Sequence, residues 1–201
     1  MRVGVLVSGR GSNLGALIAD AAQPGAPYRL VVVVSNRGSA PALDRARAAG
    51  IPAIVVERKG FDSRAAQQGE MVCVLRQHSV ELVVMAGFDQ ILEPEVIAAF
   101  AGRILNVHPS LLPAFAGTLH AQRAALEHGV KVTGCTVHLV TDEVDGGPIV
   151  LQAAVPVFDG DTEASLSARI LAQEHRLLPQ AVRLLAGGRA EVKGRRVAVR
   201  A

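Results

Sequence analysis

The stretch that decides the fold is residues 2–13, RVGVLVSGRGSN. An apolar run, Arg2–Val7, is followed by a loop with glycines at positions 9 and 11, and a helical pattern starts at Asn13. A continuously apolar strand is typical of a parallel sheet whose two faces are covered by helices. A strand, a glycine loop and a helix in this order open a βαβ unit. The stretch therefore predicts an α/β fold.

The alternation of strands and helices continues through the first half of the chain. Short runs rich in Val, Ile and Leu predict further strands at Leu30–Ser35, Ala53–Val56, Glu81–Met85 and Ile104–Val107. Helical patterns predict helices at Asn13–Ala22, Ala40–Ala49 and Ser63–Gln77. We therefore expect a mostly parallel sheet with helices on both faces.

The pattern changes after Pro113. A helix and two strands are expected at Leu119–His128, Thr133–Thr141 and Ile149–Val157. A Gly-Gly-Pro turn between these strands indicates an antiparallel pair. A long closing helix is expected at Thr162–Leu185, with Asp161 or Thr162 as its N-cap and Gly187-Gly188 as its stop. Nothing resembles a linker, so we expect a single domain over residues 1–201.

The composition describes a globular chain. Half of its 201 residues are hydrophobic, which suffices for one continuous core. No apolar run approaches the roughly 18 residues of a membrane span. The apolar stretch at the N-terminus is too short for a signal peptide and lacks a cleavage site. Cys73 and Cys135 lie in apolar stretches without metal-ligand spacing, so we expect two buried thiols and a cytoplasmic location, with a disulfide as the alternative.

The net charge of +3 arises in the C-terminal tail. From Arg189 onward five basic residues face one acid, and the rest of the chain is close to neutral. A nucleic-acid binder typically has a basic face with interleaved aromatic residues, and only 3% of this chain is aromatic. We expect no nucleic-acid partner and interpret the tail as a solvated terminal strand or a frayed end.

The glycine loop Ser8–Asn13 has the form of an anion site. Glycines at the start of a helix leave backbone N–H groups open to a phosphate. A dinucleotide fingerprint is disfavoured because position 14 is Leu14 and the second strand ends in Asn36-Arg37 without an acid. A P-loop is disfavoured because no Gly-Lys-Ser/Thr follows. The alternatives left are a small phosphate cradle and a tight turn in which Ser12 or Asn13 merely caps the helix.

Three polar residues form a candidate catalytic group. Asn106 and His108 alternate along a strand, so they share a face, at the carboxyl edge where open α/β sheets bind ligands. Asp145 lies in a glycine-flanked turn. If its carboxylate reached His108 it would favour the protonated ring and raise the pKa of His108. A structural histidine and a turn aspartate bonded to its own backbone are the alternatives.

Four motifs, in order, carry a resemblance to a known family. They are Ser8-Gly9-x-Gly11-Ser12-Asn13, Met85-Ala86-Gly87-Phe88, Asn106-x-His108-Pro109-Ser110-Leu111-Leu112-Pro113 and Asp142-x-x-Asp145-Gly146-Gly147-Pro148. With Gln173-Glu174-His175 they extend nearly end to end, and the chain resembles the phosphoribosylglycinamide formyltransferases. The resemblance implies a Rossmann-like, phosphate-binding half at residues 1–100 and a catalytic and folate half at 101–201.

The resemblance implies a reaction and a role for each site residue. The formyl group of 10-formyltetrahydrofolate, a co-substrate, would pass to the amine of glycinamide ribonucleotide in purine synthesis. Gly11, Ser12 and Asn13 would hold the phosphate and Glu174 the ribose side, and Asn106, His108 and Asp145 would be catalytic. The implied folate contacts are Arg64, Phe88, Asp89, Gln90, Ile91, Leu92, Asn106, Thr141, Asp142, Glu143, Val144 and Asp145.

The expected chemistry is acyl transfer without a metal. Asn106 and protonated His108 would stabilise the oxyanion of a tetrahedral intermediate, and Asp145 would keep His108 charged or accept the amine's proton through a water. No cluster of metal ligands is visible. We expect small-molecule substrates, no membrane partner, and a monomer or a homodimer.

The chain departs from the family pattern in places. Asp89-Gln90 replaces the usual Met-Arg, residues 114–117 lack the usual Lys or Pro, and Thr118 lengthens the next loop, which obscures the counterpart of His120. The rival interpretations are methionyl-tRNA formyltransferase or formyltetrahydrofolate deformylase, which carry extra domains, and a non-catalytic nucleotide- or folate-binding module.

Overall fold

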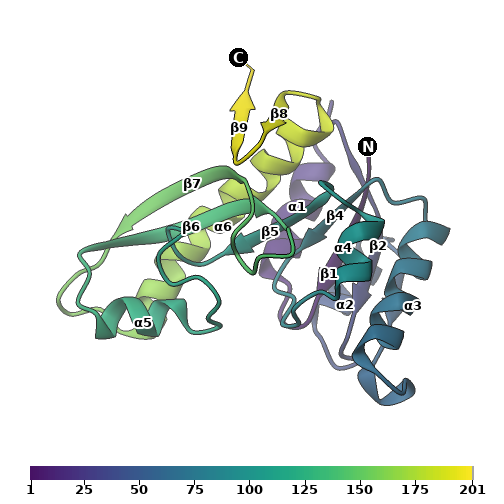
Figure 1. Ribbon diagram of the computed structural model, residues 1–201, viewed down its shortest axis with the longest axis horizontal. Helices are drawn as coiled ribbons and strands as arrows, with labels where there is room; N and C mark the ends of the chain where they lie inside the picture. The colour runs from purple at the N-terminus through teal and green to yellow at the C-terminus, as the bar shows by residue number, and fades with distance from the viewer. Residues whose placement is uncertain (201) are drawn as a thin grey trace. The chain divides into compact units, whose positions relative to one another are not determined.

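The computed structural model describes residues 1–200, which form two compact units (Figure 1). The first unit, Met1–Leu105, contains a parallel sheet in the order β3-β2-β1-β4. Its strands are β1 (Arg2–Val7), β2 (Arg29–Ser35), β3 (Ala53–Val55) and β4 (Leu82–Met85). The next strand, β5 (Ile104–His108), begins in this unit and ends in the second.

Helices connect the parallel strands of the first unit. They are α1 (Ser12–Ala21), α2 (Ala42–Ala48), α3 (Arg64–Gln77) and α4 (Pro94–Ala99), with a 3-10 turn, η1 (Arg58–Gly60), before α3. The chain moves outward from β1 to β3 and then returns to β4, so right-handed crossovers place α1 and α2 on one face and α3 on the other. α1 accordingly packs beside α2, and α3 beside α4.

One glycine lets α3 approach the sheet closely. A Cβ atom on Gly4 in β1 would lie 2.7 Å from a methyl group of Leu75 and 2.8 Å from one of Val80. Leu75 is fully buried and Val80 nearly so. The absence of a side chain at position 4 is therefore part of the core packing.

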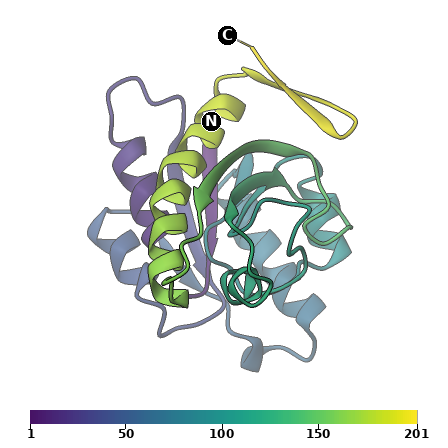
Figure 2. The ribbon, with the colours of Figure 1, turned by 90° about the vertical axis from the view of Figure 1, so that its left-hand side faces the viewer.

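The second unit starts at Asn106, and its strand order is β5-β6-β7-β9-β8. Its remaining elements are α5 (Ala121–Glu127), β6 (Val132–Leu139), β7 (Ile149–Pro156), α6 (Glu163–Ala186), β8 (Ala190–Lys193) and β9 (Arg196–Val199). β6 and β7 are antiparallel, as are β8 and β9, whereas β9 meets β7 in parallel. The long α6 lies along β6 and β7 (Figure 2).

The closing helix α6 is held by its cap and its apolar stripe. Thr162 is the N-cap: its side chain accepts from the backbone N–H of Ser165, and the Ser165 hydroxyl accepts from that of Thr162. This reciprocal pair satisfies two N–H groups that would otherwise have no partner in the helix. Buried residues, including Leu166, Ile170 and Leu177, recur every three to four positions and form the stripe.

The structure confirms the predicted fold class. Every predicted strand and helix is present, with ends shifted by no more than two residues. Three short elements were not predicted: η1, α4 and the division of the basic tail into the hairpin β8–β9. One expectation was wrong: Cys73 is exposed, because Met71, Val74 and Leu75 turn the buried side of α3 inward and leave position 73 facing solvent, whereas Cys135 is buried.

None of the helices in residues 1–200 combines the length and apolar character that a membrane-spanning segment needs.

Close packing of β6 on β7 leads to a stability prediction. A Cβ on Gly134 would lie 1.9 Å from the carbonyl oxygen of Ala153, so Gly134→Ala must push the two strands apart. We expect it to destabilise the protein by about 1–3 kcal/mol. Gly160→Ala is the control, because nothing lies within 4 Å of a Cβ there. Urea unfolding of both variants tests this, and equal midpoints would contradict it.

Candidate active site

The glycine loop of the first unit starts helix α1 through backbone geometry. Gly11 is the N-cap residue, with a left-handed φ of 71°, and no side chain caps the helix there. A Cβ on Gly11 would lie 2.6 Å from the Cβ of Ala42, so glycine is required for space as well as for conformation. The alternative in which Ser12 or Asn13 merely caps the helix does not describe this loop.

The same loop has the properties of an anion site. The backbone N–H groups of the first helical turn have no acceptor within the helix, and the helix dipole adds a partial positive charge. Asn13 is 7% exposed and Ser12 is half-buried. The backbone N–H of Ala42 donates to the carbonyl of Gly9 at 3.2 Å, which ties the loop to α2. The loop geometry is compatible with a phosphate site, which stays a prediction.

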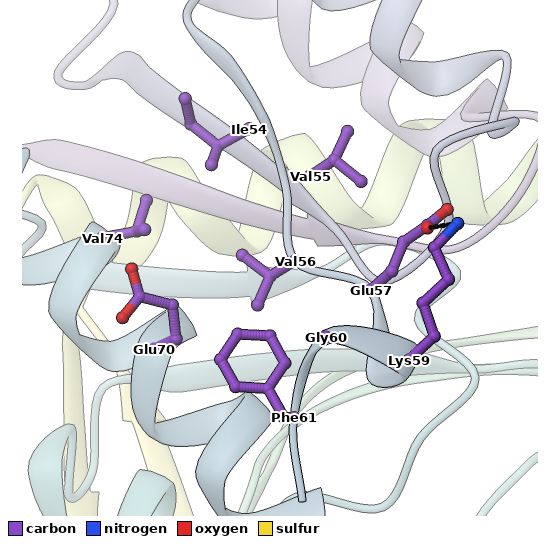
Figure 3. A pocket seen from close by; sticks show the side chains of 9 residues that line it. All are labelled: Ile54, Val55, Val56, Glu57, Lys59, Gly60, Phe61, Glu70 and Val74. Carbon is purple, nitrogen blue, oxygen red and sulfur yellow. Dashed lines mark ion pairs between the residues drawn. The ribbon is translucent and has the colours of Figure 1, made fainter.

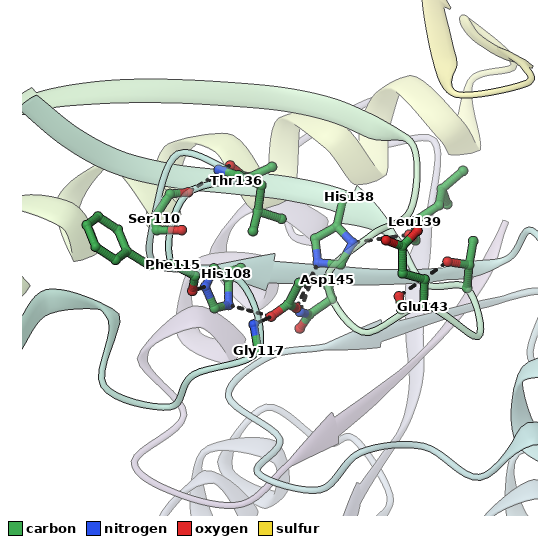
Figure 4. Close-up of polar contacts among 12 residues, drawn as sticks. His108, Ser110, Phe115, Gly117, Thr136, His138, Leu139, Glu143 and Asp145 are labelled. Carbon is green, nitrogen blue, oxygen red and sulfur yellow. Dashed lines mark hydrogen bonds and ion pairs between the residues drawn. The ribbon is translucent and has the colours of Figure 1, made fainter. Parts of the chain in front are cut away.

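In the second unit, the structure brings His108 and Asp145 together (Figure 4). Nδ1 of His108 lies 3.3 Å from Oδ2 of Asp145, and both side chains are largely buried. His108 comes from the end of β5, and Asp145 comes from the turn between β6 and β7. The predicted contact between these two residues is therefore present.

The turn that carries Asp145 is fixed by its backbone. Asp145 has a left-handed φ of 53°, which few non-glycine residues adopt. A Cβ on Gly147 would lie 1.8 Å from the carbonyl oxygen of Leu139, so the turn tolerates no side chain there. Oδ2 of Asp145 accepts from the backbone N–H of Gly117 at 2.8 Å. The carboxylate therefore bonds to another segment, and the alternative of a turn aspartate bonded to its own backbone is not observed.

The environment of His108 corrects the expected direction of its pKa. Burial of the ring lowers the pKa of His108 below its ordinary value, and the charge of Asp145 and the carbonyl of Phe115 raise it without cancelling that effect. The sequence predicted a raised pKa because it considered only the carboxylate. The loss of hydration around an imidazolium is the stronger influence here. His108 is therefore neutral near pH 7.

Both ring nitrogens of His108 have partners. Nε2 lies 2.9 Å from the carbonyl oxygen of Phe115, which only accepts, so this nitrogen carries the proton. Nδ1 of the neutral ring then has its lone pair beside Asp145. Protonation of Nδ1 would turn this contact into a charge-assisted hydrogen bond. The site is thus built to stabilise a proton once one arrives at Nδ1.

For the pKa of Asp145, unlike that of His108, the neighbouring groups outweigh the effect of burial. Burial raises it, but the imidazole of His138, the backbone N–H of Gly117 and, when it is protonated, the ring of His108 hold the pKa of Asp145 below its usual value. Asp145 is therefore ionised at neutral pH. A negative group is kept permanently beside an imidazole that can gain a proton.

His138, which the sequence did not single out, is part of the same cluster. It is 2% exposed in β6, and its Nδ1 lies 3.1 Å from the carbonyl of Leu139, so Nδ1 carries the proton. Its Nε2 accepts from Nδ2 of Asn106 at 3.1 Å and lies 3.6 Å from Asp145. His138 thus orients the amide of Asn106. A buried polar residue in an apolar strand, on the same face as Thr136, is the signal that sequence reasoning missed.

The segment that follows His108 is held by a buried hydroxyl. Oγ1 of Thr136 donates to the carbonyl of Ser110 at 2.7 Å and accepts from the backbone N–H of Leu112 at 3.0 Å. Gln152 bonds to Thr136 and to the carbonyl of Leu112. The proline-bounded segment after β5 is therefore anchored to β6 and β7. This anchoring fixes the path of the chain directly after His108.

The folate residues predicted in the first unit differ in exposure. Phe88 and Leu92 are buried, whereas Ile91 is 58% exposed. Arg64 forms an ion pair with Glu93. The side chains of Asp89 and Gln90 turn toward other residues of the same unit: Asp89 toward Asn36 and Arg37, and Gln90 toward Gln67 and Gln68.

The folate residues predicted in the second unit lie in the β6–β7 connection. Val144 is 47% exposed, and Thr141, Asp142 and Glu143 line the same exposed stretch. Oγ1 of Thr141 donates to the carbonyl of Glu143 at 3.4 Å, and Glu143 pairs with Arg195 at 3.4 Å. The connection therefore offers carboxylates and one apolar side chain to solvent.

Glu174 lies in the buried stripe of α6. It is 7% exposed, and its charge is felt by Cys135 in β6. Burial, with a further contribution from Glu174, raises the pKa of the Cys135 thiol to about 12. The thiol is therefore protonated and packs as a small apolar group.

A cavity of about 430 Å³ in the first unit lies elsewhere (Figure 3). Its lining comes from β3, η1 and α3 and includes Val56, Phe61, Glu70 and Val74. No lining residue is a predicted site residue. In residues 1–200, no three His, Cys, Asp or Glu side chains are grouped as a metal site requires.

The fold and the Asn-His-Asp group define a class of enzyme. The chain belongs to the formyl transferase family, whose model matches residues 1–182. Within this family it is 45% identical to phosphoribosylglycinamide formyltransferase of Escherichia coli, over 94% of the chain and 89% of that protein.

Two further comparisons are consistent with membership of this family. The chain is 46% identical to the human trifunctional purine biosynthetic protein adenosine-3, over 93% of its own length but only 18% of the length of that protein. Glycinamide ribonucleotide transformylase 1 from Symbiobacterium toebii has a superposable structure, with a TM-score of 0.97 and 50% identity, covering 100% of this chain and 94% of the other.

The balance of influences on His108 gives a titration prediction. Removing the charge of Asp145 removes an influence that raises the pKa of His108, so Asp145→Asn should lower that pKa further. NMR titration of the imidazole protons measures it. Asp142→Asn, with the same charge change at an exposed position of the same connection, is the control and should leave the titration unchanged. A rise in Asp145→Asn would contradict the assignment.

Proposed function

We propose that the protein transfers the formyl group of 10-formyltetrahydrofolate to the amine of glycinamide ribonucleotide. The products are formylglycinamide ribonucleotide and tetrahydrofolate, in purine biosynthesis. The observation that carries the proposal is the contact of His108 with Asp145, with Asn106 oriented beside them, in a chain of the formyl transferase family. A cytoplasmic location and a monomeric or dimeric state stay predictions.

Asn106 is proposed as the first donor to the formyl oxygen. When an amine attacks a formyl carbon, negative charge develops on that oxygen, and aligned N–H donors lower the barrier. One N–H of the Asn106 amide is directed at Nε2 of His138. An amide has two such hydrogens, so the second is available to the substrate. His138 is proposed as the residue that positions this donor.

His108 is proposed as the second donor and as the acid. Its Nε2–H is directed at the carbonyl of Phe115, so donation to a substrate requires that carbonyl to be exchanged for the formyl oxygen. Phe115 has a left-handed φ of 58°, a conformation that costs a bulky residue of order 1 kcal/mol or more and so favours rearrangement. Protonated at both nitrogens, His108 would transfer a proton to the departing folate nitrogen.

Asp145 is proposed as the charge that stabilises His108 and as the acceptor of the amine's proton through a water. A base must be ionised to accept a proton, and the lowered pKa of Asp145 keeps it so. The proton then passes from Asp145 to Nδ1 of the neutral His108, which restores the carboxylate, and His108 gives a proton to the departing folate nitrogen. The net transfer is one proton from the amine to the folate. No metal is assigned a role in these steps.

The phosphate of the substrate is assigned to Gly11, Ser12 and Asn13, and its ribose side to Glu174. The left-handed N-cap at Gly11 and the direction of the backbone N–H groups at the start of α1 support the phosphate assignment. The assignment of Glu174 rests on the family resemblance.

The formyl donor supplies an activated acyl group, and the residues proposed to bind it suit a flat, partly apolar molecule. Exposed Ile91 and Val144 offer apolar surface, and Asp142 and Glu143 offer acceptors for the N–H groups of a pterin. Arg64 is assigned to the glutamate tail, for which it would exchange its partner Glu93. The other contacts proposed are those implied by the family resemblance, except Asp89 and Gln90, whose side chains bond within the first unit.

Two rivals remain to be separated by experiment. A deformylase would release formate from the folate without any acceptor amine. A non-catalytic module would bind without turnover. Purified protein mixed with 10-formyltetrahydrofolate should release deformylated folate, followed by absorbance, only when glycinamide ribonucleotide is added. Release without the amine would indicate a deformylase, and no release would overturn the proposal.

Removal of either catalytic side chain should abolish most turnover. We expect His108→Ala and Asp145→Ala each to lower kcat by about a hundredfold or more, because each removes a proton-transfer or charge-stabilising group. His78→Ala and Asp159→Ala, both outside the proposed site, are the controls, and circular dichroism checks folding. Near-normal kcat in a folded variant would remove that residue from the mechanism.

Asn13 should act on substrate binding. Asn13→Ala removes a side chain from the phosphate cradle, so we expect KM for glycinamide ribonucleotide to rise about tenfold, the scale of a hydrogen bond to a charged group. Gln23→Ala, at the other end of α1, is the control. A fall in kcat with unchanged KM would contradict the cradle assignment.

A further inference from the structure

Asp89, where the chain departs from its family, lies at the centre of a polar network at the carboxyl edge of the first unit's sheet. It follows β4, and its neighbours in the network follow β1 and β2. These strands are adjacent, in the order β2-β1-β4. Position 89 is therefore placed to connect the ends of three strands. The middle strand, β1, leads into the Gly9–Asn13 loop.

The connection to β1 runs through Ser8. The backbone N–H of Asp89 donates to the hydroxyl of Ser8 at 3.0 Å, and the backbone N–H of Ser8 donates to the carbonyl of Gly87 at 2.9 Å. Ser8 is 6% exposed and immediately precedes the glycine loop. Movement of residues 87–89 would therefore move the start of that loop.

The connection to β2 runs through the carboxylate. Oδ1 of Asp89 accepts from Nδ2 of Asn36 at 2.8 Å, and Oδ2 pairs with Arg37. The hydroxyl of Ser35, which is fully buried, donates to the carbonyl of Arg37 at 2.8 Å and accepts from its backbone N–H at 3.1 Å. Both donors to Asp89 are thus held at the end of a core strand.

The opposite side of the segment is held independently. Gln68 donates to the carbonyl of Ile91 at 3.0 Å and accepts from the backbone N–H of Glu93 at 2.8 Å. Gln67 and Gln68 are fully buried in α3. Loss of the Asp89 carboxylate would therefore release the segment on the side that faces β2, and with it one support of the backbone that bonds to Ser8.

We propose that Asp89 is a positioning residue, which acts through Asn36, Arg37 and Ser8 to hold the Gly9–Asn13 loop in the geometry that binds the substrate's phosphate. The inference rests on the function proposed above and adds a residue that the family pattern does not supply.

Geometry, rather than the strength of the ion pair, is the reason for this role. The side chains of Arg37 and Asp89 are 59% and 30% exposed, and ion pairs this exposed contribute little to stability. Two carboxylate oxygens fix two donors at once, however, and within residues 1–200 Oδ1 of Asn36 is buried without a hydrogen-bond partner. The contact with Asp89 therefore orients this amide.

Direct contact between Asp89 and the formyl donor is the competing explanation, and kinetics separates the two. Under the positioning role, Asp89→Ala and Arg37→Gln both raise KM for glycinamide ribonucleotide about tenfold with little change in kcat, since small misplacements of a binding group weaken binding. The double variant should be no worse than either single one, because both break one network. Asp89→Asn, which keeps an acceptor for Asn36, should recover part of the loss.

The matched control is Asp44→Ala, which breaks an exposed ion pair with Arg47 on α2 and should leave both KM values unchanged. A rise in KM for 10-formyltetrahydrofolate alone, caused by Asp89→Ala and not by Arg37→Gln, would overturn the inference. So would additive effects in the double variant.

A measurement without substrate separates failure of this inference from failure of the proposed function. Hydrogen exchange of the backbone amides of residues 8–15 should be faster in Asp89→Ala and Arg37→Gln than in the wild type and in Asp44→Ala. Unchanged exchange would overturn the positioning role even in an active enzyme. Faster exchange in a protein without transferase activity would support the role and reject the function.

Discussion

The proposed active site depends on the backbone of one turn, because that turn aims the carboxylate of Asp145. The left-handed Asp145, with a glycine two residues later that admits no Cβ, leaves the chain few other paths between β6 and β7. The carboxylate is thereby fixed against both Gly117 and His108. A side chain on a flexible loop would have to be ordered on each turnover. Here the ordering is completed during folding.

Patterns in the sequence predicted the fold because strands and helices are determined largely by residues that are close together in the sequence. Val-rich runs and helical periodicity placed the strands and helices to within two residues, and alternation put Asn106 and His108 on one face. Alternation was equally available for Thr136 and His138 and was not applied. The exposure of Cys73 shows the limit of composition, because an apolar neighbourhood does not say which side of a helix a residue occupies.

What the sequence did not determine depends on distance and burial. The contact between residues 108 and 145 spans the helix α5 and the strand β6, so it follows from how the chain folds back on itself and not from spacing along the sequence. The direction of the His108 pKa depends on how much water the fold removes, which no motif encodes. Charge proximity alone predicted the wrong sign.

The side chains at positions 89 and 90 are polar, and both find hydrogen-bond partners within the first unit. A methionine and an arginine would direct an apolar group and a cation outward, whereas Asp89 and Gln90 bond to the ends of β2 and to α3. A charged side chain at a strand end either meets a ligand or needs partners of its own. Because the chain supplies those partners in Asn36 and Arg37, the carboxylate at 89 acts on the framework that holds the ligand loop. The departure from the family pattern therefore changes how that loop is supported.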